Sequence, residues 1–234
     1  RCESAWGDLA ARGPSSVATT VPPRRPSPST GTCSFLTRPS RVASTAFWWE
    51  CGENSSASLH SHQKAVEATR EGRFRNEIVP VEVEGRRGVT VVDTDEGPRA
   101  DSSLEALAKL RPVFKRDAPE GIDEHVVTAG NAPGLNDGAA AVVVASLEYA
   151  EAHGLEVDAF ISAYAVSATE PQDLFFAPIA AVNNLMQKEG KEIGDYELVE
   201  VNEAFAVQAI ADMRALGMDE ELVNVNGGAV ALGH

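Results

Sequence analysis

The chain has 234 residues, enough for one large domain or two small ones with a sizeable core. Its 20 basic and 35 acidic residues give a net charge of -15, which would repel a phosphate backbone, so we expect no nucleic-acid partner. No apolar run approaches the roughly 18 residues of a bilayer-spanning helix, and the opening lacks the apolar stretch of a signal peptide. We therefore predict a cytoplasmic protein with no membrane partner.

The first 60 residues differ in composition from the rest. They hold six basic and four acidic residues, whereas residues 61–234 hold 14 and 31. All three cysteines, Cys2, Cys33 and Cys51, lie in this segment, at spacings that fit neither a disulfide framework nor a metal site. We predict that residues 1–59 are a disordered or out-of-frame segment. The dense carboxylates of the remainder could form an ordinary solvated face, but we favour adaptation to high salt, as in a halophilic source.

Regular patterning begins near residue 60. Residues 61–72 predict a helix with Ser61 as its cap and Gly72 as its stop. His60 and His62 are therefore interpreted as residues at the start of this helix. Because no further metal-binding side chains accompany them, no metal site is expected. Residues 77–84 alternate as a half-buried strand, and a turn at 85–88 leads into a second strand at 89–92. Ser102 or Ser103 caps a helix that continues to Leu110.

The second half alternates strands with helices, which predicts the α/β class. Strands are expected at 139–145, 160–166, 197–201 and 223–226, and helices at 147–153, 179–189 and 204–216. In such folds ligands bind at the carboxyl ends of strands.

Two predicted strand ends carry unusual polar residues. Asn202 and Glu203 stand where a strand meets a helix, a place that favours developing negative charge, although the spacing alone favours Asn202 as the cap of that helix. His234 follows a run of small residues through which a ligand could approach closely, although a lone histidine can also be purely structural.

Several motifs in order resemble the thiolase family, the acetyl-CoA acetyltransferases and 3-ketoacyl-CoA thiolases. The resemblance covers residues 60–234. It rests on Ser61-His-Gln-Lys-Ala65, Gly72-Arg-Phe74, Glu77-Ile-Val-Pro80, Leu107-Ala-Lys-Leu-Arg-Pro112, Thr128-Ala-Gly-Asn-Ala132, Leu135-Asn-Asp-Gly-Ala139, Asn202-Glu-Ala-Phe-Ala206 and Val223-Asn-Val-Asn-Gly-Gly-Ala-Val-Ala-Leu-Gly-His234.

The resemblance implies a layered αβαβα sandwich made of two similar halves, with a loop domain that covers coenzyme A inserted in the first. Residues 60–130 would belong to the loop domain, 131–154 to the end of the N-terminal domain and 155–234 to the start of the C-terminal domain. The fold would therefore be incomplete in this chain.

The family's activity, and hence the activity that the resemblance implies, is acyl transfer. Two acetyl-CoA molecules condense to acetoacetyl-CoA, or 3-ketoacyl-CoA is thiolysed, through one nucleophilic and one acid/base cysteine. Coenzyme A thioesters are the substrates and no cofactor is implied. His234 would activate the nucleophile and, with a water held by Asn202, form an oxyanion hole, and Phe205 would line the same pocket.

Substrate-binding residues are implied in the same way. Arg99 would contact the nucleotide end of coenzyme A, the alternative being a solvated loop arginine. Pro133, next to Ala132, replaces a serine that in the family often bonds the pantetheine arm, and Ala106 replaces another serine near the nucleotide.

None of the three cysteines stands in the family's sequence context. We therefore predict that this chain is an inactive fragment of an acyltransferase, with a non-catalytic, acyl-CoA-binding or partner-binding thiolase-like protein as the alternative. Acyl-CoA is the expected partner, and full-length members are expected to form homodimers or homotetramers.

Overall fold

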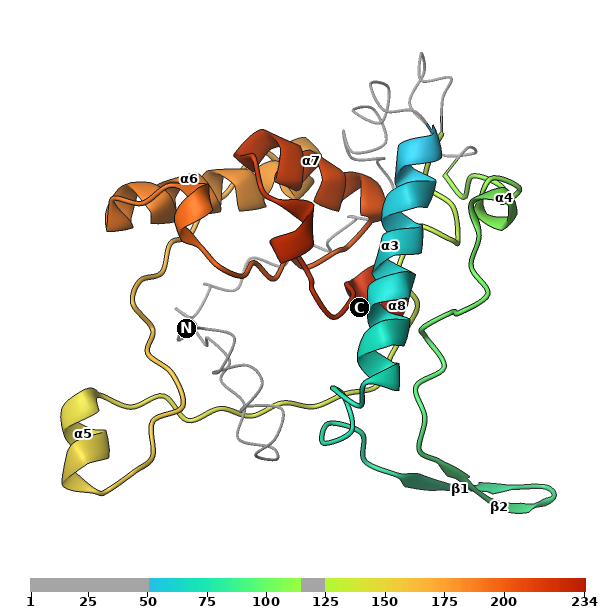
Figure 1. Ribbon diagram of the computed structural model, residues 1–234, viewed down its shortest axis with the longest axis horizontal. Coiled ribbons are helices and arrows are strands. Elements are labelled where there is room, and N and C mark those ends of the chain that lie inside the picture. Colours follow the sequence, from blue (N-terminus) through green and yellow to red (C-terminus); the bar gives the residue numbers. More distant parts are fainter. Residues whose placement is uncertain (1–50, 115–124) are drawn as a thin grey trace, which may run out of the picture.

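The structure is a computed structural model that describes residues 51–114 and 125–234. Cys2, Cys33 and most of the segment predicted to be disordered therefore lie outside the described residues. Figure 1 labels the α-helices and the strands of the described part. In chain order, with the short 3-10 helices written η, the elements are α3 (Cys51–Arg70), β1 (Val81–Gly85), β2 (Gly88–Val92), α4 (Leu104–Leu107), α5 (Leu147–Ala152), η2 (Pro171–Phe176), α6 (Ala177–Glu189), η3 (Ile193–Asp195), α7 (Ala206–Leu216), η4 (Glu220–Leu222) and α8 (Ala229–Leu232).

Helix α3 begins at Cys51 rather than at Ser61, so the predicted start was wrong and residues 51–59 are helical, not disordered. The buried residues of α3 continue through both halves of the helix: Asn54, Ser55, Ser58, Ser61, His62, Ala65 and Ala68. The first five are polar. A buried helix face made of polar residues gives no apolar periodicity, and this is why the pattern was not recognised.

The predicted hairpin is present. Strands β1 and β2 pair antiparallel from Val81 opposite Val92 to Gly85 opposite Gly88. All their residues are exposed, so the expected half-buried strand was wrong. The hairpin extends away from the helices, and no element in the described part of the chain covers it (Figure 1).

Two expected strands, 139–145 and 160–166, are not assigned as strands. Most of their apolar side chains are exposed, with Val143 at 91% and Phe160 at 72%. A strand requires a neighbour to pair with, and none lies beside these segments among the described residues. The other two expected strands meet at a single parallel bridge, Val199 to Val223.

The three expected helices of the second half are confirmed. Helix α5 is capped by the Ser146 hydroxyl, which accepts a hydrogen bond from the Tyr149 amide. Helices α6 and α7 end at Gly190 and Gly217, which adopt the left-handed conformation at φ 66° and 68°. Helix α4 is capped by Ser103 as expected, but it ends at Leu107 rather than continuing to Leu110.

The body of the structure is helical. Helix α3 packs against α8, α7 and α4, and α7 packs in turn against α6 and η2 (Figure 1). A small apolar core of Val126, Val127 and Val207 is covered by Ala132, Phe175 and Phe205. Within residues 51–114 and 125–234, no helix combines the length and apolar character needed to traverse a bilayer.

Candidate functional site

A buried carboxylate joins three segments of the chain. Glu203 is 5% exposed, and its Oε2 accepts hydrogen bonds from the Ser61 hydroxyl at 2.8 Å and from the Val230 amide at 2.9 Å. The Ser61 oxygen in turn accepts a hydrogen bond from the Gly228 amide at 3.0 Å. These bonds fix the turn after Asn202 and the start of α8 to the middle of α3. Helix α8 leads directly to His234.

Burial raises the pKa of the Glu203 carboxyl, while the hydrogen bonds from Val230 and Ser61 oppose this rise. The neighbouring turn is held by Asn224, whose side chain accepts a hydrogen bond from the Val201 amide at 2.8 Å and donates one to the Val201 carbonyl at 3.1 Å. The 202–205 turn is therefore fixed on both sides.

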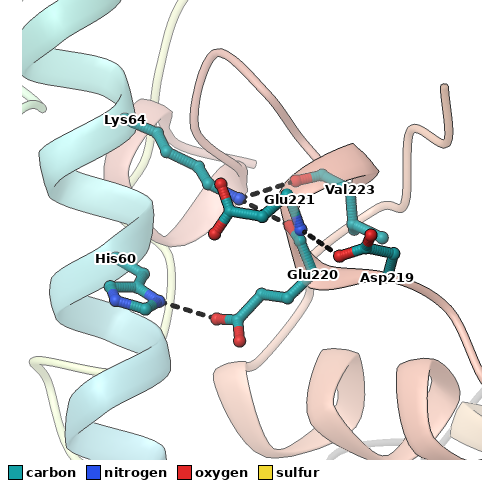
Figure 2. A network of polar contacts seen from close by, with 6 residues as sticks. All are labelled: His60, Lys64, Asp219, Glu220, Glu221 and Val223. Carbon is teal, nitrogen blue, oxygen red and sulfur yellow. Dashed lines mark hydrogen bonds and ion pairs between the residues drawn. The ribbon is translucent and has the colours of Figure 1, made fainter.

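Figure 2 shows a second, more exposed connection between α3 and the C-terminal region. Lys64 Nζ donates to the carbonyl oxygens of Glu220 and Val223 at 2.8 and 3.0 Å. His60 Nδ1 lies 2.7 Å from Glu220 Oε1, with both side chains about half exposed. The network fixes η4, and with it the Val199–Val223 bridge, against α3. Neither His60 nor Ser61 lies at a helix start; both are well inside α3.

The Asn202 side chain is exposed. The residue at the N-cap position of α7 is Phe205, so Asn202 does not cap this helix. Its carbonyl oxygen accepts a hydrogen bond from the Ala204 amide at 2.9 Å. Among the described residues, none forms a hydrogen bond with the Asn202 amide group, which leaves that group open to a ligand or water.

The structure brings four of the predicted site residues together. The His234 amide donates to the carbonyl oxygen of Gly134 at 3.1 Å, so His234 lies beside the segment that contains Ala132 and Pro133. Ala132 and Phe205 pack on the same apolar core. The Phe205 ring contacts the Phe175 ring edge to face, with centroids 5.5 Å apart.

Arg99 lies on a loop that α3 and α8 hold from two sides. Its backbone amide donates to His62 Nδ1 at 3.2 Å. A Cβ on Gly97 would lie 2.5 Å from the Ala231 carbonyl oxygen, so the loop passes directly against α8. The Arg99 guanidinium is exposed, and no carboxylate in the described part of the chain pairs with it.

Three residues of the site were missed as functional candidates. Ser61 was interpreted as a cap and His62 as a residue at a helix start, whereas both make buried contacts to distant segments. Glu203 was noted beside Asn202 without a partner. The available indication was that Ser61 and His62 both lie in Ser61-His-Gln-Lys-Ala65, one of the motifs that carry the family resemblance.

No group of three or more histidine, cysteine, aspartate or glutamate side chains within the described ranges is arranged to hold a metal ion. The polar groups of the predicted site residues are the amide of Asn202, the imidazole of His234 and the guanidinium of Arg99. Such groups can bind carbonyl oxygens and phosphates.

Substitution of Gly227 by alanine is expected to destabilise the fold by about 2–4 kcal/mol, because it combines a left-handed backbone with a clash. Gly227 has φ 89°, and its Cβ would lie 2.7 Å from both the Ser61 carbonyl oxygen and Ala65 Cβ. Gly154→Ala is the matched control, since Gly154 has φ 62° and open space around it. Urea unfolding measures both; equal losses would show that α3 does not require this close approach.

Two family models match the chain. The thiolase N-terminal domain matches residues 52–148 and the thiolase C-terminal domain matches residues 155–234. The first match begins eight residues before the segment on which the sequence resemblance rests, within α3. The chain therefore belongs to the thiolase family.

Individual relatives agree with this assignment. The acetyl-CoA acetyltransferase of Paracoccus denitrificans is 46% identical over 188 residues, covering 80% of this chain and 46% of the relative. The crystal structure of the Bacillus anthracis acetyl-CoA acetyltransferase aligns with a TM-score of 0.73 at 39% identity, covering 83% of this chain and 47% of that one. Human mitochondrial 3-ketoacyl-CoA thiolase in complex with CoA aligns with a TM-score of 0.71 at 38% identity, covering 83% and 46%.

The backbone therefore follows a thiolase-like α/β fold, as the resemblance implied. The chain spans about half the length of the curated relatives it matches.

Proposed function

We propose that the protein is an acyltransferase of the thiolase type that binds coenzyme A thioesters with no further cofactor, and that residues 1–234 alone do not turn them over because none of the three cysteines stands in the family's sequence context. The observation that carries this proposal is the buried Glu203 link, which joins the turn bearing Asn202 to the helix that leads to His234. Family membership supports the substrate class, because matched relatives are named acetyl-CoA acetyltransferases and one aligned thiolase structure contains CoA.

In this proposal His234 and Asn202 supply the polar groups that stabilise negative charge on a thioester oxygen. Both side chains are exposed, so both are accessible to a substrate. Phe205, Ala132 and Pro133 provide the apolar side of the same site. The Arg99 guanidinium has the geometry and charge to pair with a phosphate of the nucleotide end.

A non-catalytic acyl-CoA-binding role is the second candidate. The observation that favours it is the sequence around the cysteines, because none of Cys2, Cys33 and Cys51 stands in the family's sequence context. Covalent acyl transfer requires a thiolate beside the base that activates it.

The wider setting forms part of the same proposal. We place the protein in the cytoplasm, as a homodimer or homotetramer, with acyl-CoA rather than nucleic acid or a membrane as its partner. The excess of carboxylates in residues 61–234 supports adaptation to high salt, where these charges are screened.

Purified residues 1–234 are expected to bind coenzyme A without catalysing thiolysis of acetoacetyl-CoA. Calorimetric titration measures binding, and the disappearance of acetoacetyl-CoA measures turnover. Absence of binding would contradict both candidate functions. If the wild type turns over acetoacetyl-CoA and Cys33→Ala or Cys51→Ala abolishes this turnover, the catalytic candidate is correct and the non-catalytic one is wrong.

A further inference from the structure

His62 makes a contact that the proposed chemistry does not use. It lies in the middle of α3, is 6% exposed, and its Nδ1 accepts a hydrogen bond from the Arg99 backbone amide at 3.2 Å. The two residues are 37 positions apart, so this bond fixes a distant loop to the helix. The same loop contacts α8 at Gly97.

This hydrogen bond requires an unprotonated Nδ1, because a protonated ring nitrogen can only donate. Burial lowers the pKa of the His62 imidazole, and the positive charge of Arg99 lowers it further, while Asp101 opposes these effects. Helix α8, Ala229–Leu232, carries no charged residue. The imidazole is therefore neutral near pH 7 and can accept the bond.

We propose that His62 is a positioning residue that holds the Arg99 loop, and thereby the Arg99 guanidinium, in place for the phosphate-bearing end of coenzyme A. This inference rests on the proposed function, because it takes coenzyme A as the ligand. His62 itself is buried beneath the loop and acts through the Arg99 backbone. The loop position is set by α3 on one side and by α8 on the other.

Two nearly isosteric substitutions separate the hydrogen bond from packing. His62→Asn places a side-chain oxygen where Nδ1 stands and preserves an acceptor, whereas His62→Leu has a similar shape without one. We expect faster deuterium uptake in peptides containing Arg99 for His62→Leu and wild-type uptake for His62→Asn. Equal uptake by the two variants overturns the proposal without reference to any ligand.

Binding of free coenzyme A and of 3′,5′-ADP gives the second readout. His62→Leu is expected to weaken both by about fivefold to tenfold, the net value of one hydrogen bond, while His62→Asn binds as the wild type. Arg99→Ala is expected to weaken binding at least as much. If His62→Leu exchanges faster but binds normally while Arg99→Ala binds weakly, the positioning role is overturned.

A pH series on the wild type provides a measurement that does not depend on the leucine variant folding. Because the pKa of His62 lies below its usual value of 6.5, protonation removes the acceptor only as the pH is lowered into the acid range, and wild-type affinity then falls relative to that of His62→Asn, which does not titrate. A constant ratio across this range contradicts the proposal. If wild type and Arg99→Ala bind coenzyme A equally well, the proposed contact between Arg99 and the ligand is wrong. The deuterium-exchange comparison then still decides whether His62 holds the loop.

Discussion

Replacing His234 by alanine is expected to lower turnover about 100- to 1,000-fold, because preorganised groups aimed at an oxyanion contribute this much to rate. The measurement uses a chimera in which residues 60–234 replace the matching residues of the Paracoccus denitrificans acetyl-CoA acetyltransferase, which is 46% identical over the aligned region. Condensation of acetyl-CoA is then followed directly. Asn202→Ala is expected to cause a loss of the same order.

The structure explains why little stability should be lost in either variant. The His234 and Asn202 side chains are exposed, and His234 is held through its backbone amide, which alanine retains. His153→Ala and Asn183→Ala are matched controls, since both residues are exposed and lie on or beside other helices. Turnover at the control level in His234→Ala or Asn202→Ala would reduce that residue to a structural role.

Local features of the fold could be predicted from the sequence. Gly190 and Gly217 end their helices in the left-handed conformation, and the Gly85–Gly88 turn closes the hairpin, because these depend on residues close in the chain. The Ser103 and Ser146 caps are local for the same reason.

The contacts that build the site could not be predicted in this way. Ser61 and Glu203 are 142 positions apart, and both looked like ordinary polar residues until the fold placed them together. Residues with the strongest strand patterns, such as Val143 and Phe160, are exposed because pairing depends on a neighbouring strand rather than on their own sequence. Family resemblance supplied the roles of His234 and Asn202, and the structure supplied the positions of Glu203 and His62.

A buried carboxylate on α7 supports the other large expected effect. Asp212 is 1% exposed, its Oδ2 accepts a hydrogen bond from the Gln208 side-chain amide, and its Oδ1 has no partner. Burial raises the pKa of Asp212 from 3.8 to about 6, while the Gln208 bond opposes the rise. The folded state therefore holds a proton that the unfolded chain releases more readily.

The sign of the pH dependence follows from this difference. Because the folded pKa lies above the unfolded one, the contribution of Asp212 to stability is fully present below 3.8 and is lost as the pH rises through about 6. Above that pH, the ionised carboxylate costs about 3 kcal/mol. The cost arises from desolvation, so salt should change it little.

Asp212→Asn is therefore expected to gain about 3 kcal/mol in unfolding free energy relative to wild type between about pH 4 and about pH 8. Asparagine keeps an acceptor for the Gln208 amide. Any free-energy penalty for burying the asparagine amide is the same at pH 4 and at pH 8, so it cancels when the two pH values are compared. Urea unfolding of both proteins across this range gives the result, with Asp137→Asn as the control at an exposed position. If the difference in unfolding free energy between Asp212→Asn and wild type stays constant with pH, the prediction is wrong. Asp212 would then be ionised at a solvated site in the folded protein, and α7 would be packed less tightly against α3 than the structure shows.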